Sequence, residues 1–254
     1  MIQMTERARD AAMDIRDIPV IRHPEAMRLA GTESERMLDL VRLLDYDDWS
    51  RPTDCTEWSV KDIVVHQLGE AAAIGSIREM VHQMRAARRL PKTMARVDRL
   101  NAVHVSERRH LSTNQLLELL APALRRALRA RRRAPALIRK IRFSADNFGR
   151  VSFGYISDIV VTRDSFIHRV DITRATGKPM AVTADHEGRL IAHVVRDWAS
   201  HHGRAFMLRL SGPAGGVYRS GSGGEEIELD ALQFCRILSG RAPGDRLMKT
   251  QVPF

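Results

Sequence analysis

One segment of the chain carries charged side chains along a helix face that is otherwise apolar. Within residues 155–177, Asp164, His168 and Asp171 are spaced so that a helix places them on one face. The apolar residues that share or flank this face are Val160, Val161, Ile167, Ile172 and Ala175. Burying carboxylates and imidazoles is costly unless they are paired or bound to a metal. We interpret the strip as part of a metal site that requires one more ligand, and His66 in an earlier helix is the candidate.

Apolar residues at helical spacing predict that most of the first 180 residues are helical. The predicted helices span residues 24–44, 59–85, 98–109, 113–132 and 155–177. Ser59 followed by Asp62 has the form of an N-terminal capping box, and Gly177 suits a C-cap. Residues 24–180 are therefore expected to form a helical bundle.

The pattern changes near Lys178 and Pro179, after which shorter elements alternate. The predicted elements are a helix over 183–203, strands over 206–211 and 226–229, a turn-rich stretch over 212–224 and a helix over 231–238 capped by Asp230. The fold class is thus mainly α, with a small α+β domain over residues 181–254 after the bundle.

The N-terminal segment mixes acidic and basic residues without an apolar core, so residues 1–23 are expected to be a flexible extension and not a secretory signal. The sequence has no run of about 18 apolar residues, so no transmembrane helix is expected. Cys55 and Cys235 are too few for a disulfide framework, and we expect both to be ordinary small apolar residues. A reducing cytoplasm fits this composition.

The formal net charge of +10 comes mainly from one basic run. Its members are Arg125, Arg126, Arg129, Arg131, Arg132, Arg133, Arg139, Lys140 and Arg142. Such a run could bind nucleic acid, an anionic lipid surface or an acidic partner, or it could be a solvated helix end with its loop. Nucleic acid is the less favoured partner, because no aromatic residues alternate with the arginines to stack on bases.

Two segments together indicate a family. Residues 48–69 read DWSRPTDCTEWSVKDIVVHQLG, and residues 164–177 read DSFIHRVDITRATG. Together with LSGPAGG at 210–216 and DALQFCRILSGR at 230–241, they resemble the mycothiol-dependent maleylpyruvate isomerases. The resemblance spans about residues 25–254. It implies a DinB-like, metal-binding four-helix bundle followed by a C-terminal α+β domain.

The resemblance also implies a zinc-type site, whose ligands would be His66, Asp164 and His168. The family usually has glutamate where this chain has Asp164, and the shorter aspartate reaches less far toward a metal. Two imidazoles and one carboxylate leave a coordination position open, as in catalytic zinc sites. A thiol bound there would lose its proton near neutral pH and act as a nucleophile.

Several residues are candidates for supporting roles. Asp62 and Glu70 flank His66 by one helical turn on either side, and either could accept its second ring N–H. Asp171 could orient His168 or make a structural hydrogen bond. Arg236 and Arg241 could bind an anionic substrate or form salt bridges within the small domain.

Five other histidines are expected at the surface or between domains, without a role in the site: His104, His110, His193, His201 and His202. The leading hypothesis is a cytoplasmic enzyme that binds a divalent metal and a low-molecular-weight thiol, such as mycothiol. It would isomerise a small electrophile or transfer sulfur to it. The alternative is a non-catalytic metal-binding bundle that serves as a small-ligand or interaction module.

Overall fold

The computed structural model describes residues 12–145 and 148–254, which form two compact units. The larger unit is His23–Met180, and the smaller one combines residues 12–22 with Ala181–Phe254. Within the described residues, no helix is both long enough and apolar enough to cross a membrane.

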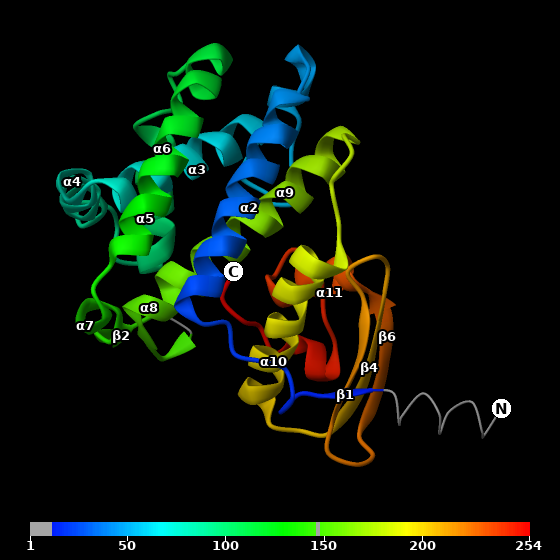
Figure 1. Cartoon of the computed structure of the whole chain (residues 1–254). Coiled ribbons are helices and arrows are strands. Elements are labelled where there is room, and N and C mark those ends of the chain that lie inside the picture. Colours follow the sequence, from blue (N-terminus) through cyan, green and yellow to red (C-terminus); the bar gives the residue numbers. More distant parts are fainter. Residues whose placement is uncertain (1–11, 146–147) are drawn as a thin grey trace. The chain divides into compact units, whose positions relative to one another are not determined.

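Four long helices build the larger unit (Figure 1): α2 (His23–Arg42), α3 (Val60–Gly75), α6 (Thr113–Arg133) and α9 (Val161–Thr176). They form a ring in which α3 packs on α6, α6 on α2, α2 on α9 and α9 on α3. The enclosed core includes Met37, Leu40, Val64, Leu68, Leu116, Leu120 and Ile172. The predicted four-helix bundle is confirmed, and its apolar stripes explain why the helices associate.

Shorter elements connect the four helices: η1 (Tyr46–Ser50), α4 (Ile77–Ala87), α5 (Arg96–Ser106), α7 (Ala136–Arg139), β2 (Arg142–Ser144), β3 (Arg150–Ser152), α8 (Phe153–Tyr155) and η3 (Ile156–Val160). The prediction of one helix over residues 59–85 is wrong, because Ser76 is extended (φ −150°, ψ 117°). The Ser76 hydroxyl accepts a hydrogen bond from the amide of Glu79 and so begins a new helix, α4. The capping box of Ser59 and Asp62 at the start of α3 is confirmed.

The smaller unit packs helices on a four-stranded sheet. Its helical elements are η4 (Ala184–Gly188), α10 (Arg189–His202), α11 (Ala231–Leu238) and η5 (Arg246–Lys249). Its strands are β1 (Met13–Asp14), β4 (Phe206–Ser211), β5 (Gly216–Ser220) and β6 (Glu225–Asp230), in the order β1-β5-β4-β6. Trp198 lies at the centre of this core, where its ring meets Phe206 at 4.8 Å and Phe234 at 5.4 Å between centroids.

The sequence pattern does not predict two strands of this unit. The stretch 212–224, expected to be turn-rich, also contains β5, which pairs antiparallel with β4. Met13 and Asp14, expected in a flexible extension, form β1 and pair in parallel with Tyr218 and Arg219. The rest of that expected extension, residues 1–11, lies outside the described residues.

Gly69 allows α3 and α5 to approach closely. A Cβ at this position would lie 2.7 Å from the Cβ and 2.9 Å from the Cα of His104. We expect Gly69→Ala to lower the free energy of unfolding by about 1–3 kcal/mol, because backbone must move to admit the methyl group.

Gly31 of α2 provides the matched control, because a Cβ there would meet its nearest atom at an ordinary 3.5 Å. Gly31→Ala should be neutral or stabilise by up to about 1 kcal/mol, since alanine favours helix. Urea unfolding of both variants measures the difference, and equal effects would contradict the close approach.

Candidate functional site

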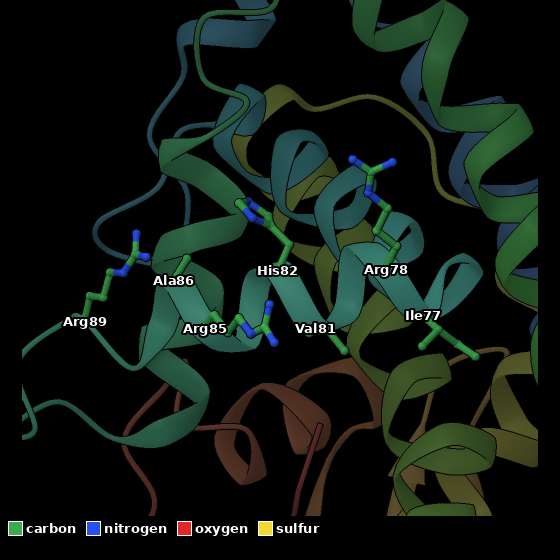
Figure 2. A pocket seen from close by; sticks show the side chains of 7 residues that line it. All are labelled: Ile77, Arg78, Val81, His82, Arg85, Ala86 and Arg89. Carbon is green, nitrogen blue, oxygen red and sulfur yellow. The ribbon is translucent and has the colours of Figure 1, made fainter.

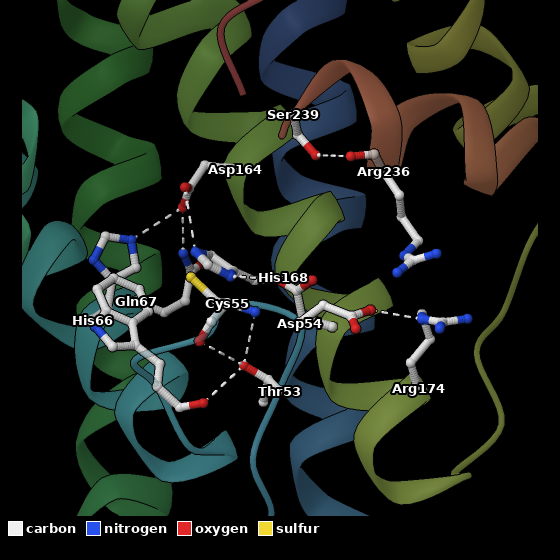
Figure 3. A network of polar contacts seen from close by, with 12 residues as sticks. Thr53, Asp54, Cys55, His66, Gln67, Asp164, His168, Arg174, Arg236 and Ser239 are labelled. Carbon is white, nitrogen blue, oxygen red and sulfur yellow. Dashed lines mark hydrogen bonds and ion pairs between the residues drawn. The ribbon is translucent and has the colours of Figure 1, made fainter. Parts of the chain in front are cut away.

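Three side chains from two helices of the bundle converge on one point (Figure 3). His66 comes from α3, and Asp164 and His168 come from α9, one turn apart. One ligand-type atom of each lies within 4.8 Å of the others. Nε2 of His66 is 3.2 Å from Oδ2 of Asp164, and Nε2 of His168 is 3.4 Å from Oδ1. The structure therefore brings together the three residues that the sequence suggested, in a set that could hold one metal ion.

Asp171 holds His168 from the far side of the ring. Its Oδ2 lies 3.0 Å from Nδ1 of His168, and the Asp171 side chain is fully buried. Nδ1–H donates to this carboxylate in the tautomer that leaves Nε2 free to bind a metal. Metal-binding histidines usually have such a partner on the other ring nitrogen, so this geometry agrees with the orienting role suggested for Asp171.

His104 of α5 holds His66 in a similar way. The Nδ1 atoms of the two rings are 3.2 Å apart, so one ring donates and the other accepts. Burial first, and then the neighbouring His66 and Arg108, hold the pKa of His104 well below its usual range. A neutral His104 can accept the Nδ1–H of His66. The expectation that His104 lies at the surface or between domains is therefore wrong.

Asp164 lies between the two imidazoles and also accepts a hydrogen bond from Gln67. Nε2 of Gln67 is 2.7 Å from Oδ2 of Asp164. Burial alone would raise the pKa of Asp164, but His168 and His66 outweigh it and hold the pKa well below its usual range. The carboxylate is thus ionised and fixed on both oxygens. Its side chain is 19% exposed and each imidazole 3%, so solvent reaches the cluster mainly at Asp164.

The loop before α3 covers the two imidazoles with an indole. The Trp58 ring centroid lies 4.9 Å from that of His66 and 5.7 Å from that of His168. The loop is held by its own hydrogen bonds, since the Thr53 hydroxyl donates to the Trp58 carbonyl and the Trp58 amide to the Cys55 carbonyl. Trp58 therefore forms an apolar wall of the site.

Other suggested supporting residues have different positions. Asp62 does not hold His66, because its Oδ2 accepts from the amide of Ser59 and its Oδ1 from Nε of Arg109. Asp62 therefore caps α3, and the expectation that it orients His66 is wrong. Arg236 and Arg241 belong to the smaller unit, in α11 and just after it, and their contact with a substrate stays a prediction.

Glu70 also does not occupy the place expected for it at the His66 ring. It lines a small cavity of about 30 Å³ together with Gln67, Arg131 and Ser165. Burial, and secondarily the charge of Asp164, raise the pKa of Glu70 to about 8, although Arg131 and His168 oppose the shift. Glu70 is therefore mostly protonated at neutral pH. Arg131, expected in a solvated run, is buried and donates to the Thr162 hydroxyl at 2.7 Å.

This raised pKa predicts a pH-dependent stability of the metal-free protein. Glu70 has an ordinary pKa of 4.5 when unfolded, so between pH 5 and pH 8 the unfolded chain releases a proton that the folded chain retains. The free energy of unfolding therefore falls as pH rises from 5 to 8. Because Glu70→Gln cannot ionise, we expect its free energy of unfolding to rise by about 3–4 kcal/mol relative to that of the wild type from pH 5 to pH 8.

Chemical unfolding at both pH values measures this difference. Glu118→Gln, on the exposed face of α6, is the control and should follow the wild type. If the free energy of unfolding changes by the same amount from pH 5 to pH 8 in Glu70→Gln and in the wild type, Glu70 ionises normally in the folded chain.

A separate pocket of about 490 Å³ lies along α4 (Figure 2), lined by Ile77, Arg78, Val81, His82, Arg85, Ala86 and Arg89. Its three arginines could attract an anion, but none of the lining residues belongs to the His66, Asp164 and His168 cluster. His82 already has a partner, because its Nε2 lies 2.8 Å from Oε1 of Glu107. The pocket therefore offers no ligand set comparable to that cluster.

Comparisons with known proteins show the fold and the family of the chain. A solved structure of a mycothiol-dependent maleylpyruvate isomerase is similar over 91% of this chain and 92% of its own, with a TM-score of 0.55 and 17% identity. A histidine-to-alanine mutant of such an isomerase gives the same coverage and identity, with a TM-score of 0.54. No curated protein matches the chain. The model of the mycothiol maleylpyruvate isomerase N-terminal domain matches residues 30–173, more than half of the chain, and the chain therefore belongs to this family.

Proposed function

We propose that this protein is a metal-dependent enzyme that uses a low-molecular-weight thiol, such as mycothiol, to isomerise a small electrophile or to transfer sulfur to it. The observation that carries the proposal is the convergence of His66, Asp164 and His168 within 4.8 Å. Family membership supports the thiol. The cytoplasm is the proposed location, because two cysteines, Cys55 and Cys235, are too few for a disulfide framework.

The donor set fits a divalent metal, and zinc is the proposed ion. Both imidazoles face Asp164 through Nε2 while Nδ1 has a partner, His104 for His66 and Asp171 for His168. Three protein ligands with solvent access at Asp164 match a catalytic zinc site, which keeps one position open. The bound ion would supply Lewis acidity that lowers the pKa of a thiol or water in that position.

The residues of the chain would position the reactants. Trp58 presents an apolar wall beside the imidazoles, and the side of Asp164 that solvent reaches is where a thiol would enter. In the isomerase reaction, the thiolate adds to an activated C=C bond and forms a C–S bond. The remaining C–C single bond rotates, and the C–S bond then breaks to restore the alkene and the thiolate. In S-transfer, the C–S bond persists and a leaving group departs.

Turnover assays with mycothiol test this proposal. Metal-loaded and metal-free protein are supplied with the thiol and maleylpyruvate, and then with epoxides and alkylating agents. We expect turnover of at least one electrophile that depends on both thiol and metal and is lost in His168→Ala. If the protein binds metal but no electrophile is consumed, the non-catalytic binding module is the better description.

The position of His104 predicts that it strengthens metal binding without being a ligand. His104→Phe fills a similar space but removes the acceptor for Nδ1–H of His66, so we expect metal affinity to fall by about 10–100-fold. His104→Gln retains an acceptor oxygen and should recover part of this loss. Chelator competition measures the affinities, and His110→Ala, exposed just beyond α5, is the control. An unchanged metal affinity in His104→Phe would show that His104 does not support metal binding.

A further inference from the structure

The basic run at the end of α6 forms an exposed surface without acidic neighbours in sequence. Between residues 119 and 145 there are nine basic residues and no acidic residue. Two of the nine are committed elsewhere, since Arg131 is buried and Arg139 donates to Oδ2 of Asp158 at 2.7 Å. The other seven are exposed: Arg125, Arg126, Arg129, Arg132, Arg133, Lys140 and Arg142.

Helix geometry gathers five of these cations on one side of α6. The buried residues of the helix include Leu116, Leu120, Ala123 and Ala127. At 100° per residue, Arg125, Arg129, Arg132 and Arg133 project from the opposite side, and Arg126 lies at its edge. The result is a positive stripe that runs to the C-terminal end of α6, and the exposed Lys140 and Arg142 follow after α7.

Large aliphatic side chains follow directly after this stripe. Leu137 is 80% exposed, Ile141 57% and Ile138 46%. The backbone beneath them is ordered, because the amide of Phe153 donates to the carbonyl of Ile141 and the β2–β3 hairpin begins at Arg142. Several exposed aliphatic side chains within five residues mark an interaction site more often than isolated ones do.

Charge and apolar exposure together identify the chemistry of the partner. Phosphates of nucleic acid would satisfy the cations but leave Leu137, Ile138 and Ile141 in water. Phe143, the one aromatic residue between 119 and 145, is half-buried, so bases have little to stack on. An anionic bilayer satisfies both kinds of side chain, since lipid phosphates bind arginine and lysine while aliphatic groups enter the acyl boundary.

We propose that the exposed arginines of α6 and the segment Leu137–Arg142 form a docking surface for an anionic phospholipid membrane. The protein would bind peripherally and reversibly, with Leu137, Ile138 and Ile141 inserted among the headgroups. None of these residues belongs to the cluster of His66, Asp164 and His168, so the proposal stands whether or not the proposed enzyme activity does.

Vesicle co-sedimentation of the full chain tests the docking surface. At low salt, vesicles of phosphatidylcholine with phosphatidylglycerol should bind the protein, and vesicles of phosphatidylcholine alone should not. Arg132→Gln/Arg133→Gln should weaken binding about thirtyfold, because each cation near the surface contributes about fivefold. Leu137→Ser/Ile138→Ser/Ile141→Ser retains every charge and should weaken binding at least tenfold.

Matched controls change the same kinds of exposed residue elsewhere in the chain. Val20→Ser/Val97→Ser and Arg42→Gln/Arg204→Gln should bind the anionic vesicles as the wild type does. Circular dichroism verifies that each variant is folded. Absence of vesicle binding at low salt, or full binding by the aliphatic triple variant, would overturn the proposal. Tighter binding of duplex DNA than of vesicles at the same salt would also overturn it, in favour of a nucleic-acid surface.

Discussion

Replacing His168 by alanine is expected to lower the affinity for a divalent metal by about 100- to 1000-fold. Structural zinc sites with four ligands bind with about 10–16 kcal/mol, so one ligand contributes about 2.5–4 kcal/mol. His168 faces Asp164 through Nε2, and its side chain is buried, with 3% exposed. Competition with a coloured chelator measures the affinity directly.

Two further variants make this prediction specific. Asp171→Asn leaves Nε2 in place but weakens the partner of Nδ1, so a smaller loss of about 10–100-fold is expected. His82→Ala removes a histidine that is 56% exposed on α4 and should change nothing. An order of effects other than His168, Asp171, His82 would contradict the assigned roles.

Replacing Arg169 by methionine is expected to lower the free energy of unfolding by about 3–5 kcal/mol. Nε and Nη2 of Arg169 in α9 donate to the two carboxylate oxygens of Glu33 in α2, at 2.5 and 2.9 Å. Both side chains are 1% exposed. The variant leaves a buried carboxylate without this fork of donors, and the desolvation cost of the remaining charge accounts for the large effect.

The double variant Glu33→Leu/Arg169→Met distinguishes loss of the whole ion pair from loss of one member. It should be much more stable than Arg169→Met, because the core then holds neither member of the ion pair. Arg174→Met is the matched control on the same helix. Its partner is Asp54 at 2.7 Å, but the two side chains are 50% and 28% exposed, so a loss within about 1 kcal/mol is expected. Equal losses for Arg169→Met and Arg174→Met in urea unfolding would contradict the account.

Local signals in the sequence predicted most of the bundle. Apolar spacing and the Ser59 capping box give helices whose ends depend on residues close by in the chain. The break at Ser76 was missed because the apolar pattern of α3 reaches Ile74 and α4 resumes it at Ile77. Strands β1 and β5 were missed for another reason: they are short, and pairing with residues far away in the sequence stabilises them.

The candidate site could be predicted only in part, and the reason is again distance along the chain. Asp164, His168 and Asp171 share a helix face, so their spacing reveals them. His104 and Gln67 carry no such signal, because their roles depend on how α5 and α3 approach their neighbours. A weak signal was Gly69, a glycine inside an apolar helix, which permits the contact of α3 with α5 beside His104.

Asp164 stands where the resemblance described in the sequence analysis leads us to expect a glutamate. The shorter side chain is held on both sides, by Gln67 and His66 at Oδ2 and by His168 at Oδ1. These contacts fix the orientation of the carboxylate, which compensates for the shorter reach of the aspartate side chain toward a metal. We therefore expect the cluster to bind a metal despite the shorter acid.

X-ray absorption spectroscopy of the zinc-loaded protein, with and without a small thiol, tests the central claim most directly. The account predicts one zinc per chain with nitrogen and oxygen neighbours at about 2.0–2.2 Å, and one added sulfur neighbour at about 2.3 Å when thiol is present. Zinc that binds equally well to the double variant His66→Ala/His168→Ala, or zinc that gains no sulfur neighbour from the thiol, would contradict it.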